Sequence, residues 1–312
     1  MKGPDRLNAD VKSMDGLIPL LIDIQQNLDG DLNLEYLAAA YGYSAYHFQR
    51  LFKEVVGETP KRYVQRLRME KAAYKLWITQ QSVIDVGLAV GFKNHETFTR
   101  AFRRYYGTTP RDFRSDGHLR RREHLKAQKS WKPDDCVLSP VRFEMLRPMS
   151  LLTYRHLGDY MEIPEAFSEA DTLWRPLIEW AKRHRIGHQP VAMAIFHDNP
   201  WLTPKNAQRT DICVPLTTPL AGPDVGSMRN MPFEGGLFGV IEHMGPYETL
   251  RHAFRRLADT IHESKQYRHP EEPAGVICVK SRIGNLVSRS EVWMPVVKLS
   301  RSSFRKGRRS KS

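Results

Sequence analysis

Apolar residues recur three and four positions apart through the first part of the chain, a spacing that predicts amphipathic helices. The first helix is predicted over residues 15–28 and ends at Gly30. Two short helices follow, with a turn at Gly42 between them, and a longer helix is expected over residues 61–77. A second pair of short helices lies on either side of Gly91. The N-terminal region is therefore predicted to be all-α.

The two pairs of short helices repeat each other along the sequence. The motif Gly-Glu-Thr-Pro at residues 57–60 recurs as Gly-Thr-Thr-Pro at residues 107–110. Arg50 recurs in the same way as Arg100. Each pair has a helix, a glycine turn and a second helix, which is the arrangement that places a helix in the DNA major groove. Two copies on a rigid connecting helix are expected to enter successive major grooves about 34 Å apart.

Basic residues gather where these helices lie. Residues 50–132 hold 20 Lys and Arg against 8 Asp and Glu, and residues 300–312 hold 6 basic and no acidic side chains, in a chain of net charge +13. A basic block of this kind is expected to attract a polyanion. A solvated basic surface that keeps the protein soluble is the plainer interpretation, and charge alone fits RNA as well as DNA.

Residues 15–117 resemble the AraC/XylS-type DNA-binding domain. The resemblance rests on Gly-Tyr-Ser-x-x-His-Phe-Gln-Arg-x-Phe-Lys at residues 42–53, on the matching residues 91–103, and on residues 107–114. It implies two helix-turn-helix units joined by a long helix, and sequence-specific binding of double-stranded DNA. By position it assigns groove-facing side chains to the second helix of each unit: Tyr46, Gln49, Arg50 and Lys53 in the first, and His95, Glu96, Thr97, Arg100 and Arg103 in the second.

The chemistry of these side chains suits base recognition. Arginine can hold guanine with two hydrogen bonds, glutamine can pair with adenine, and glutamate can accept a hydrogen bond from cytosine. Phosphate contact is an equal alternative for Arg50 and Arg100, because most protein–DNA hydrogen bonds go to the backbone. The apolar residues between them are expected to form the core: Phe48, Phe52, Phe98 and Phe102.

Composition argues against several other classes of protein. No apolar run approaches the roughly 18 residues of a membrane span. The N-terminus lacks the basic-then-apolar order of a signal peptide. Cys136, Cys213 and Cys278 lie far apart without a Cys-x-x-Cys pair, which disfavours a disulfide framework or a zinc site. We therefore expect a cytoplasmic protein without membrane contact, metal or cofactor.

From residue 137 onward the hydrophobic pattern changes. Apolar residues alternate with polar ones over short runs, which predicts strands, and two longer runs have helical spacing. Strands are expected over residues 141–146, 150–156, 191–196, 211–216, 235–241, 276–280 and 290–297, and helices over residues 163–183 and 247–263.

A second repeat appears within this half. The sequence His-Leu-Gly-Asp-Tyr at residues 156–160 recurs as His-Met-Gly-Pro-Tyr at residues 243–247. We predict an α+β domain of two βαββ-like repeats, with a cleft between them, over residues 137–298. A charged linker over residues 118–136 precedes it, and its arginines at 120–122 either add phosphate contacts or are simply solvated. A basic tail covers residues 299–312.

This second half resembles the GyrI-like ligand-binding domain. The matching features are the two His-x-Gly-x-Tyr sequences, His-Asp-Asn-Pro at 197–200, the pair of glycines at 235–236, and Glu-Val-Trp-Met-Pro-Val at 291–296. The resemblance implies a small, often cationic or amphipathic ligand in an aromatic-lined cleft. Ordinary core packing is the alternative for each aromatic candidate. The candidate ligand residues are Tyr160, Trp174, Phe196, Phe238, Glu242 and Tyr247.

One feature of that family is missing from its usual place. The family often has a glutamate two residues before an aromatic in the penultimate strand, where this chain has Val-Ile-Cys-Val at residues 276–279. Glu242 or Glu291 would have to supply the acid. A cleft that receives a protein partner is the alternative.

Three functions remain open from the sequence. The leading hypothesis is a transcription regulator that binds DNA with its first half, responds to a ligand or protein partner with its second, and works with RNA polymerase. Its domain order is similar to the Rob-type arrangement. A non-specific nucleoid-binding protein is another hypothesis.

An enzyme is the third possibility. Some DNA-repair methyltransferases pair an AraC-type segment with a catalytic cysteine, and some GyrI-like domains hydrolyse small molecules. This chain has no Pro-Cys-His-Arg sequence, and the strand carboxylate is missing. His156, His197 and His243 suggest a metal or a general base, but two of them end equivalent strands, which favours a structural role. No catalytic residue is assigned.

Overall fold

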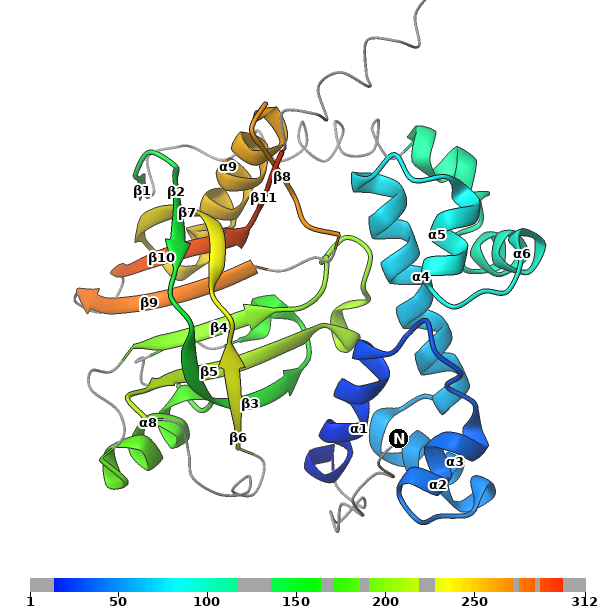
Figure 1. Ribbon diagram of the computed structural model, residues 1–312. Coiled ribbons are helices and arrows are strands. Elements are labelled where there is room, and N and C mark those ends of the chain that lie inside the picture. Colours follow the sequence, from blue (N-terminus) through cyan, green and yellow to red (C-terminus); the bar gives the residue numbers. More distant parts are fainter. Residues whose placement is uncertain are drawn as a thin grey trace, which may run out of the picture. The chain divides into compact units, whose positions relative to one another are not determined.

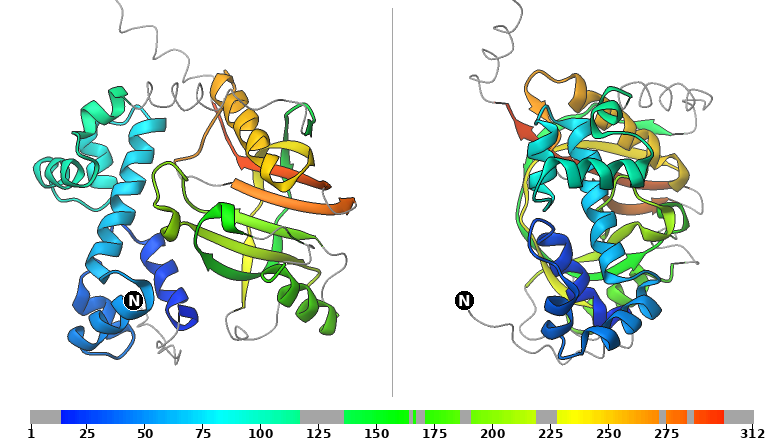
Figure 2. Two further views of the ribbon diagram at one scale, coloured as in Figure 1. Left: turned by 180° about the vertical axis from the view of Figure 1, so that it is seen from behind. Right: turned by 90° about the vertical axis from the view of Figure 1, so that its right-hand side faces the viewer.

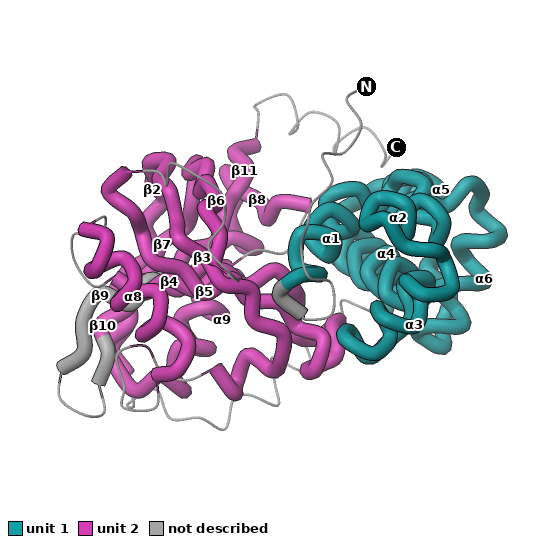
Figure 3. The backbone as a smooth tube through the Cα atoms, turned by 90° about the horizontal axis from the view of Figure 1, so that it is seen from below, with its two compact units in different colours: residues 1–129 teal, residues 130–312 magenta. Residues whose placement is uncertain are grey.

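The chain divides into two compact units, residues 1–129 and residues 130–312, which Figure 3 draws in different colours. The computed structural model describes residues 14–116, 136–163, 166, 171–185, 191–218, 228–271, 275–283 and 287–299. The first unit is helical and the second is built on a sheet, so the predicted all-α and α+β halves are confirmed. The expected linker and basic tail lie outside the described residues, apart from Cys136 and Leu299.

The first unit is organised around one long helix, α4 (Pro60–Ile78). In Figure 1 one end of α4 carries α2 (Leu34–Ala40) and α3 (Ala45–Val56), and the other end carries α5 (Val83–Ala89) and α6 (His95–Tyr106). Helix α1 (Met14–Gln26) contacts α3. The predicted helices over residues 15–28 and 61–77 are confirmed to within two residues at each end.

Matching caps begin and end the second helix of each pair. Ser44 Oγ and Asn94 Oδ1 accept backbone N–H groups of the first turn at 3.4 and 2.9 Å. Gly57 and Gly107 end α3 and α6 with left-handed φ angles of 86° and 75°. A side-chain cap pairs an N–H that the first turn leaves without a partner, and glycine adopts positive φ without Cβ strain. The caps therefore fix α3 and α6 at equivalent positions of the repeat.

Aromatic rings form the core beneath both pairs. The four phenylalanines predicted to be buried are fully buried, which confirms that expectation. Each pair also receives a ring from the helix that follows it: Tyr63 meets Phe52 edge-on at 5.6 Å, and Phe113 meets Phe102 edge-on at 5.3 Å. Edge-on contacts of this kind add to the stabilisation that burial of the rings provides.

The second unit contains strands and two described α-helices, α8 (Trp174–Arg183) and α9 (Leu250–Glu263). Short 3-10 turns occur at Tyr160–Glu162, Lys205–Ala207 and Tyr247–Thr249. The described strands are β1 (Val137–Leu138), β2 (Arg142–Leu146), β3 (Met149–Leu157), β4 (Ala192–Phe196), β5 (Arg209–Leu216), β6 (Arg229–Phe233), β7 (Gly236–Gly245), β8 (Tyr267–Arg268), β9 (Gly275–Ile283), β10 (Val287–Pro295) and β11 (Val297–Lys298).

Nine of these strands form one antiparallel sheet. Their order is β1-β7-β10-β9-β4-β5-β3-β6, and β2 also pairs with β7. Strands β4 and β9 lie side by side at the centre. Strands β2 and β6 each pair with a strand of the other half of the sheet. Strand β2, which precedes β3, pairs with β7, and β6, which precedes β7, pairs with β3. Strands β8 and β11 form a separate two-stranded ladder.

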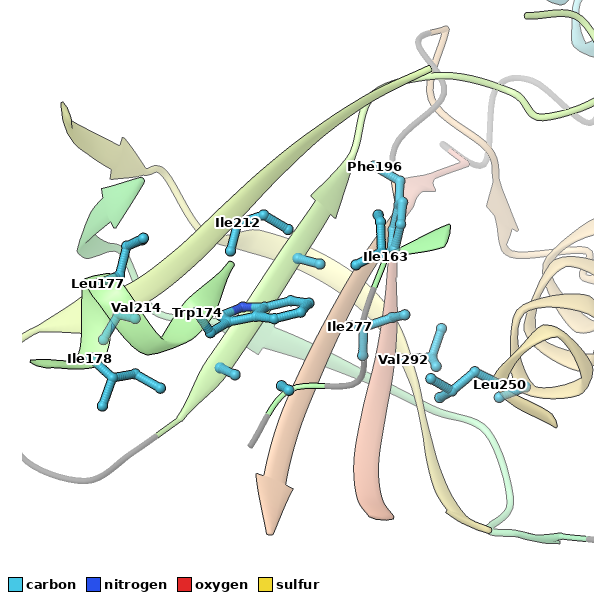
Figure 4. Close-up of a cluster of buried hydrophobic side chains, with 14 of the residues drawn as sticks. Ile163, Trp174, Leu177, Ile178, Phe196, Ile212, Val214, Leu250, Ile277 and Val292 are labelled. Atoms are coloured by element: carbon cyan, nitrogen blue, oxygen red, sulfur yellow. The ribbon is translucent and has the colours of Figure 1, made fainter. Parts of the chain in front are cut away.

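The two faces of the large sheet carry different clusters. Helix α8 packs on β3 and β5, and α9 packs on β7 and β10, so both helices cover the same face (Figure 2). Figure 4 shows this cluster, in which Trp174 of α8 lies among strand residues such as Ile212 and Ile277. Successive strand residues point to opposite faces. The other face accordingly holds a second cluster, which includes Leu151, Met193, Cys213, Phe238, Val240 and Trp293.

The sheet unit departs from the prediction in three places. The helix expected over residues 163–183 begins only at Trp174, because Asp171 Oδ1 accepts the backbone N–H groups of Leu173 and Trp174 and so starts the helix there. The helix expected from residue 247 begins with a 3-10 turn before α9. Strand β6 was not predicted, because Pro232 resembles a loop signal, but proline is tolerated on an edge strand.

Candidate nucleic-acid interface and effector domain

Helices α3 and α6 each present one polar face and bury the other. All nine side chains that the sequence assigns to DNA are exposed, and the apolar residues between them are buried. Tyr46 is 81% exposed, although a tyrosine ring gains much from burial. The exposed faces therefore hold side chains that the fold itself does not use: Tyr46, Gln49, Arg50 and Lys53 on α3, and His95, Glu96, Thr97, Arg100 and Arg103 on α6.

The cations on these faces are not neutralised by the unit itself. Within the described part of the chain, no carboxylate forms an ion pair with Arg50, Lys53, Arg100 or Arg103. Two other candidates are held in place. The Thr97 hydroxyl donates to Asn94 Oδ1 at 2.8 Å, and the His95 ring lies 3.3 Å from the Thr99 hydroxyl. The faces thus combine free positive charge with oriented polar groups.

A groove of about 850 Å³ lies between the two helix pairs. It reaches Gln49 of α3 and Arg100 of α6, so it connects the two exposed faces. Its walls also include Lys61 and Gln65 of α4 and Arg104 of α6, which the sequence did not single out. Lys61 and Arg104 are exposed, and their charge makes the groove basic despite the nearby acids Asp31 and Glu35.

The six candidate ligand residues of the sheet unit do not all lie on one face of the sheet. Trp174 is 1% exposed and donates its indole N–H to the Met193 carbonyl at 2.8 Å, so it belongs to the core beneath α8. Tyr160, Phe196 and Tyr247 pack against the same helix-facing cluster. Phe238 and Glu242 lie on the opposite face of β7.

The acids that the sequence named as substitutes do meet. Glu242 of β7 and Glu291 of β10 are direct cross-strand neighbours. Arg142 of β2 lies between them, with Nη2 2.6 Å from Glu291 Oε1 and Nη1 3.6 Å from Glu242 Oε1. Trp293 donates its indole N–H to Glu291 Oε2 at 3.1 Å. The buried acid is therefore present beside an aromatic ring, but a guanidinium of the same chain already compensates it.

A second buried ionic cluster lies in the other half of the sheet. Arg155 of β3 faces Asp211 of β5 and donates to both carboxylate oxygens, at 2.5 and 2.9 Å. His197 Nε2 lies 2.7 Å from Asp211 Oδ2. Burial alone would raise the pKa of Asp211, but the hydrogen bonds from His197 and Arg155 hold that pKa well below its usual range. Burial lowers the pKa of His197, with Asp211 opposing the shift.

His243 and His156 end equivalent strands but differ in their surroundings. The Thr249 hydroxyl donates to the Pro246 carbonyl at 2.6 Å, so it accepts from His243 Nε2 at 2.7 Å. Burial, with a smaller effect of His252, lowers the pKa of His243 to about 4. His156 is half-buried, and burial lowers its pKa as well. His243 is therefore a neutral hydrogen-bond donor that ties the end of β7 to the following turn.

Metal-binding clusters and membrane-spanning helices are both absent from the described residues. No three His, Cys, Asp or Glu side chains in that part of the chain come close enough together to hold a metal ion. None of its helices combines the length and the apolar character that crossing a membrane requires.

The geometry defines a protein with a double helix-turn-helix unit followed by an α+β unit, and sequence comparison agrees. The model of a helix-turn-helix domain matches residues 37–116, and the model of the GyrI-like small-molecule-binding domain matches residues 139–297, which is half of the chain. The regulatory protein SoxS of Salmonella typhimurium is 34% identical over 99 residues, covering 31% of this chain and 92% of SoxS. The chain belongs to the family of AraC-type helix-turn-helix regulators and carries a GyrI-like domain.

Two further proteins are similar over about a third of this chain. The right origin-binding protein of Escherichia coli K12 is 39% identical over 95 residues, which are 30% of this chain. The match spans a third of that protein's length. A solved transcriptional regulator from Chromobacterium violaceum is 30% identical, covers 31% of this chain and 88% of its own, and superposes with a TM-score of 0.29.

Proposed function

We propose that this protein is a sequence-specific DNA-binding transcription regulator whose two recognition helices, α3 and α6, enter successive major grooves of one duplex. The observation that carries the proposal is the repetition of one exposed face. Both helices begin at a side-chain cap, end at a left-handed glycine, bury aromatic rings and expose cations that have no acidic partner among the described residues. The relatives are named as regulators of transcription, which supports the same function.

The groove between the helix pairs suits the DNA backbone. A duplex read by two helices in successive major grooves must pass one phosphate ridge between them. In our proposal Lys61 and Arg104 contact that ridge, while Gln49, Arg50, His95, Glu96 and Arg100 reach base edges. Contacts to phosphate position a protein on DNA, and contacts to bases supply the specificity.

For the sheet unit we propose an effector-binding role in the cytoplasm. Support comes from the match to a small-molecule-binding domain over residues 139–297. The order β3-α8-β4-β5 recurs as β7-α9-β9-β10, apart from the short strand β8 between α9 and β9, which supports two βαββ-like repeats. In this proposal the ligand or protein partner binds the sheet face that carries Glu242 and Glu291 and changes how the helical unit acts on RNA polymerase.

Selection of bound duplexes from a random pool tests the DNA-binding function. The full chain should enrich one sequence with two conserved segments about one helical turn apart. Arg50→Ala and Arg100→Ala should each weaken binding to that sequence by about 1–3 kcal/mol if they hold guanine, and each should relax specificity in its own segment only. Equal weakening on every sequence would assign these arginines to phosphate instead.

The same selection separates the alternatives. A nucleoid-binding protein would enrich no sequence, and the regulator hypothesis would then be wrong. Repeating the selection with a panel of cationic, amphipathic and neutral metabolites tests the effector role. A compound that changes the affinity of the full chain for the enriched site, but not its binding to random DNA, would support it.

A further inference from the structure

Three segments of the helical unit meet at one side chain, Arg68 of α4. Its Nε donates to the carbonyl of Leu28 at 2.8 Å, and its Nη2 donates to the carbonyl of Gly30 at 2.7 Å. Both carbonyls belong to the segment between α1 and α2, which leads into the first helix-turn-helix unit. The turn of the second helix-turn-helix unit lies against the same guanidinium at Gly91. A Cβ placed at Gly91 would lie 2.8 Å from Arg68 Nη2 and 2.7 Å from the Leu28 carbonyl oxygen.

The first helix-turn-helix unit offers an internal control for this contact. Gly42 occupies the equivalent turn position and has a similar backbone, with φ of 71° against 84° at Gly91. A Cβ at Gly42 would meet nothing within 4 Å. Both turns need glycine for the positive φ. Only the second turn also needs it for close approach, so the approach of Gly91 to Arg68 is not a requirement of the turn itself.

The opposite side of α4 carries a link to the first helix-turn-helix unit. Arg66 Nη2 forms an ion pair with Glu58, which follows α3, at 2.8 Å, and Arg66 Nη1 pairs with Glu70 at 3.3 Å. Tyr105 of α6 lies in the same electrostatic environment. Burial and then the charge of Glu70 raise the pKa of Tyr105 to about 12, with Arg66 opposing the shift. On this side α4 is therefore tied to the first helix-turn-helix unit by the Arg66–Glu58 ion pair.

We propose that the Arg68–Gly91 contact locks the two helix-turn-helix units at one separation, so that the chain recognises two DNA half-sites only at one fixed spacing. This inference rests on the proposed DNA-binding function and adds a positioning residue to it. Arg68 acts through the backbone of both units. Its two hydrogen bonds to main-chain carbonyls and its contact with Gly91 involve the backbone of the segment before α2 and of the turn before α6.

The lock has a measurable consequence for binding. When two binding units are rigidly joined, binding of the first raises the effective concentration of the second at its own half-site. One added base pair moves the second half-site by about 3.4 Å and turns it by roughly 35°, which a rigid protein does not follow. A loosened junction gives up part of the effective concentration but follows the displaced half-site better.

The test compares four proteins on matched duplexes: wild type, Arg68→Met, Gly91→Ala and Gly42→Ala. The duplexes carry the selected full site, each half-site alone, and the full site with one added base pair. Arg68→Met and Gly91→Ala should bind the full site about tenfold more weakly, bind each half-site as wild type does, and lose less affinity on the added base pair. Gly42→Ala carries the same strain of positive φ and should keep the wild-type ratio of full-site to half-site affinity.

The outcomes are distinguishable from failure of the proposed function. If the wild-type protein binds the full site no more tightly than a half-site, DNA recognition by two helices is wrong, and the proposed lock is wrong as well. If the wild-type protein binds the full site more tightly than each half-site, but Arg68→Met and Gly91→Ala respond to the added base pair as wild type does, the lock alone is overturned. Equal losses on full and half-sites would also overturn it, since they indicate a merely structural contact. Should Arg68→Met fail to fold, the two glycine variants decide the question.

Discussion

The helical unit and the sheet unit keep their charged side chains in different places. On α3 and α6 the cations are exposed and have no acidic partner within the described residues, as for Arg50 and Arg100. In the sheet the charges are buried in pairs, as in Arg155 with Asp211, whose side chains are 4% and 0% exposed. The exposed faces of α3 and α6 therefore offer their charge to a partner, whereas these buried sheet residues use their charge on each other.

This difference predicts opposite responses to mutation. An exposed charge contributes little to folding, because water solvates it in both states. A buried charge that loses its partner is costly, because nothing replaces the lost compensation. Charge changes on the exposed faces of α3 and α6 should alter binding while stability is unchanged, and charge changes in the buried pairs of the sheet unit should do the reverse.

The largest effect is expected at Asp211. Asp211→Asn leaves Arg155 buried beside a neutral group and should destabilise the sheet unit by about 3–5 kcal/mol. Guanidinium unfolding followed by fluorescence measures the change. Glu96→Gln, on the exposed face of α6, is the matched control and should change stability by less than about 0.5 kcal/mol. A loss below about 1 kcal/mol at Asp211 would contradict the assigned role of the pair.

A smaller effect is expected from the titration of His243. Its folded pKa of about 4 lies below the ordinary histidine value of 6.5, so the fold favours the neutral ring. The stabilisation is complete above pH 6.5 and is lost as the pH falls from 6.5 toward 4, by about 3 kcal/mol in total. His243→Gln keeps a donor for Thr249 and should flatten the pH dependence of unfolding in that window. His156→Gln, at the half-buried equivalent position, should flatten it less. Parallel curves for wild type and His243→Gln would contradict this account.

The smallest effect sharpens the account of the basic groove. Lys61 and Arg62 are adjacent and exposed on α4, but only Lys61 lines the groove. Lys61→Ala should reduce the slope of log affinity against log salt by about 0.9, the value for one phosphate contact. Arg62→Ala removes the same charge and should leave the slope nearly unchanged. The phosphate assignment fails if both variants shift the slope equally. Binding is measured at several salt concentrations on one selected site.

The local structure of the helical unit was readable from the sequence, because its signals are local. Helical spacing, caps and the repeated glycine turns predicted α3 and α6. The resemblance to the AraC/XylS-type domain assigned nine side chains to groove-facing positions, and all nine are exposed. Arg68 could not be predicted, since its partners Leu28 and Gly30 lie about forty residues away and are main-chain carbonyls that any residue would supply.

The sheet unit was less predictable, because its chemistry depends on strand register. Alternation located most strands, but it does not say which strands are neighbours. The pairing of Glu242 with Glu291 required the order β7-β10, and that of Arg155 with Asp211 required β3-β5. Aromatic residues such as Trp174 were proposed for a cleft because the resemblance to the GyrI-like domain implies an aromatic-lined one. Their burial beneath α8 follows from the helix starting at Trp174, which depends on Asp171.

The crossing of β2 and β6 bears on how the protein is synthesised. Strand β3 leaves the ribosome before its edge partner β6. Strand β2 must wait for β7, because the paired residues of these two strands lie about a hundred positions apart in the sequence. At roughly 5–20 residues per second, the wait for β7 lasts on the order of ten seconds. During that time the unpaired edges of β2 and β3 are exposed to other nascent chains. Slow translation of residues 216–236 should therefore lower the yield of folded protein more than slow translation after residue 245.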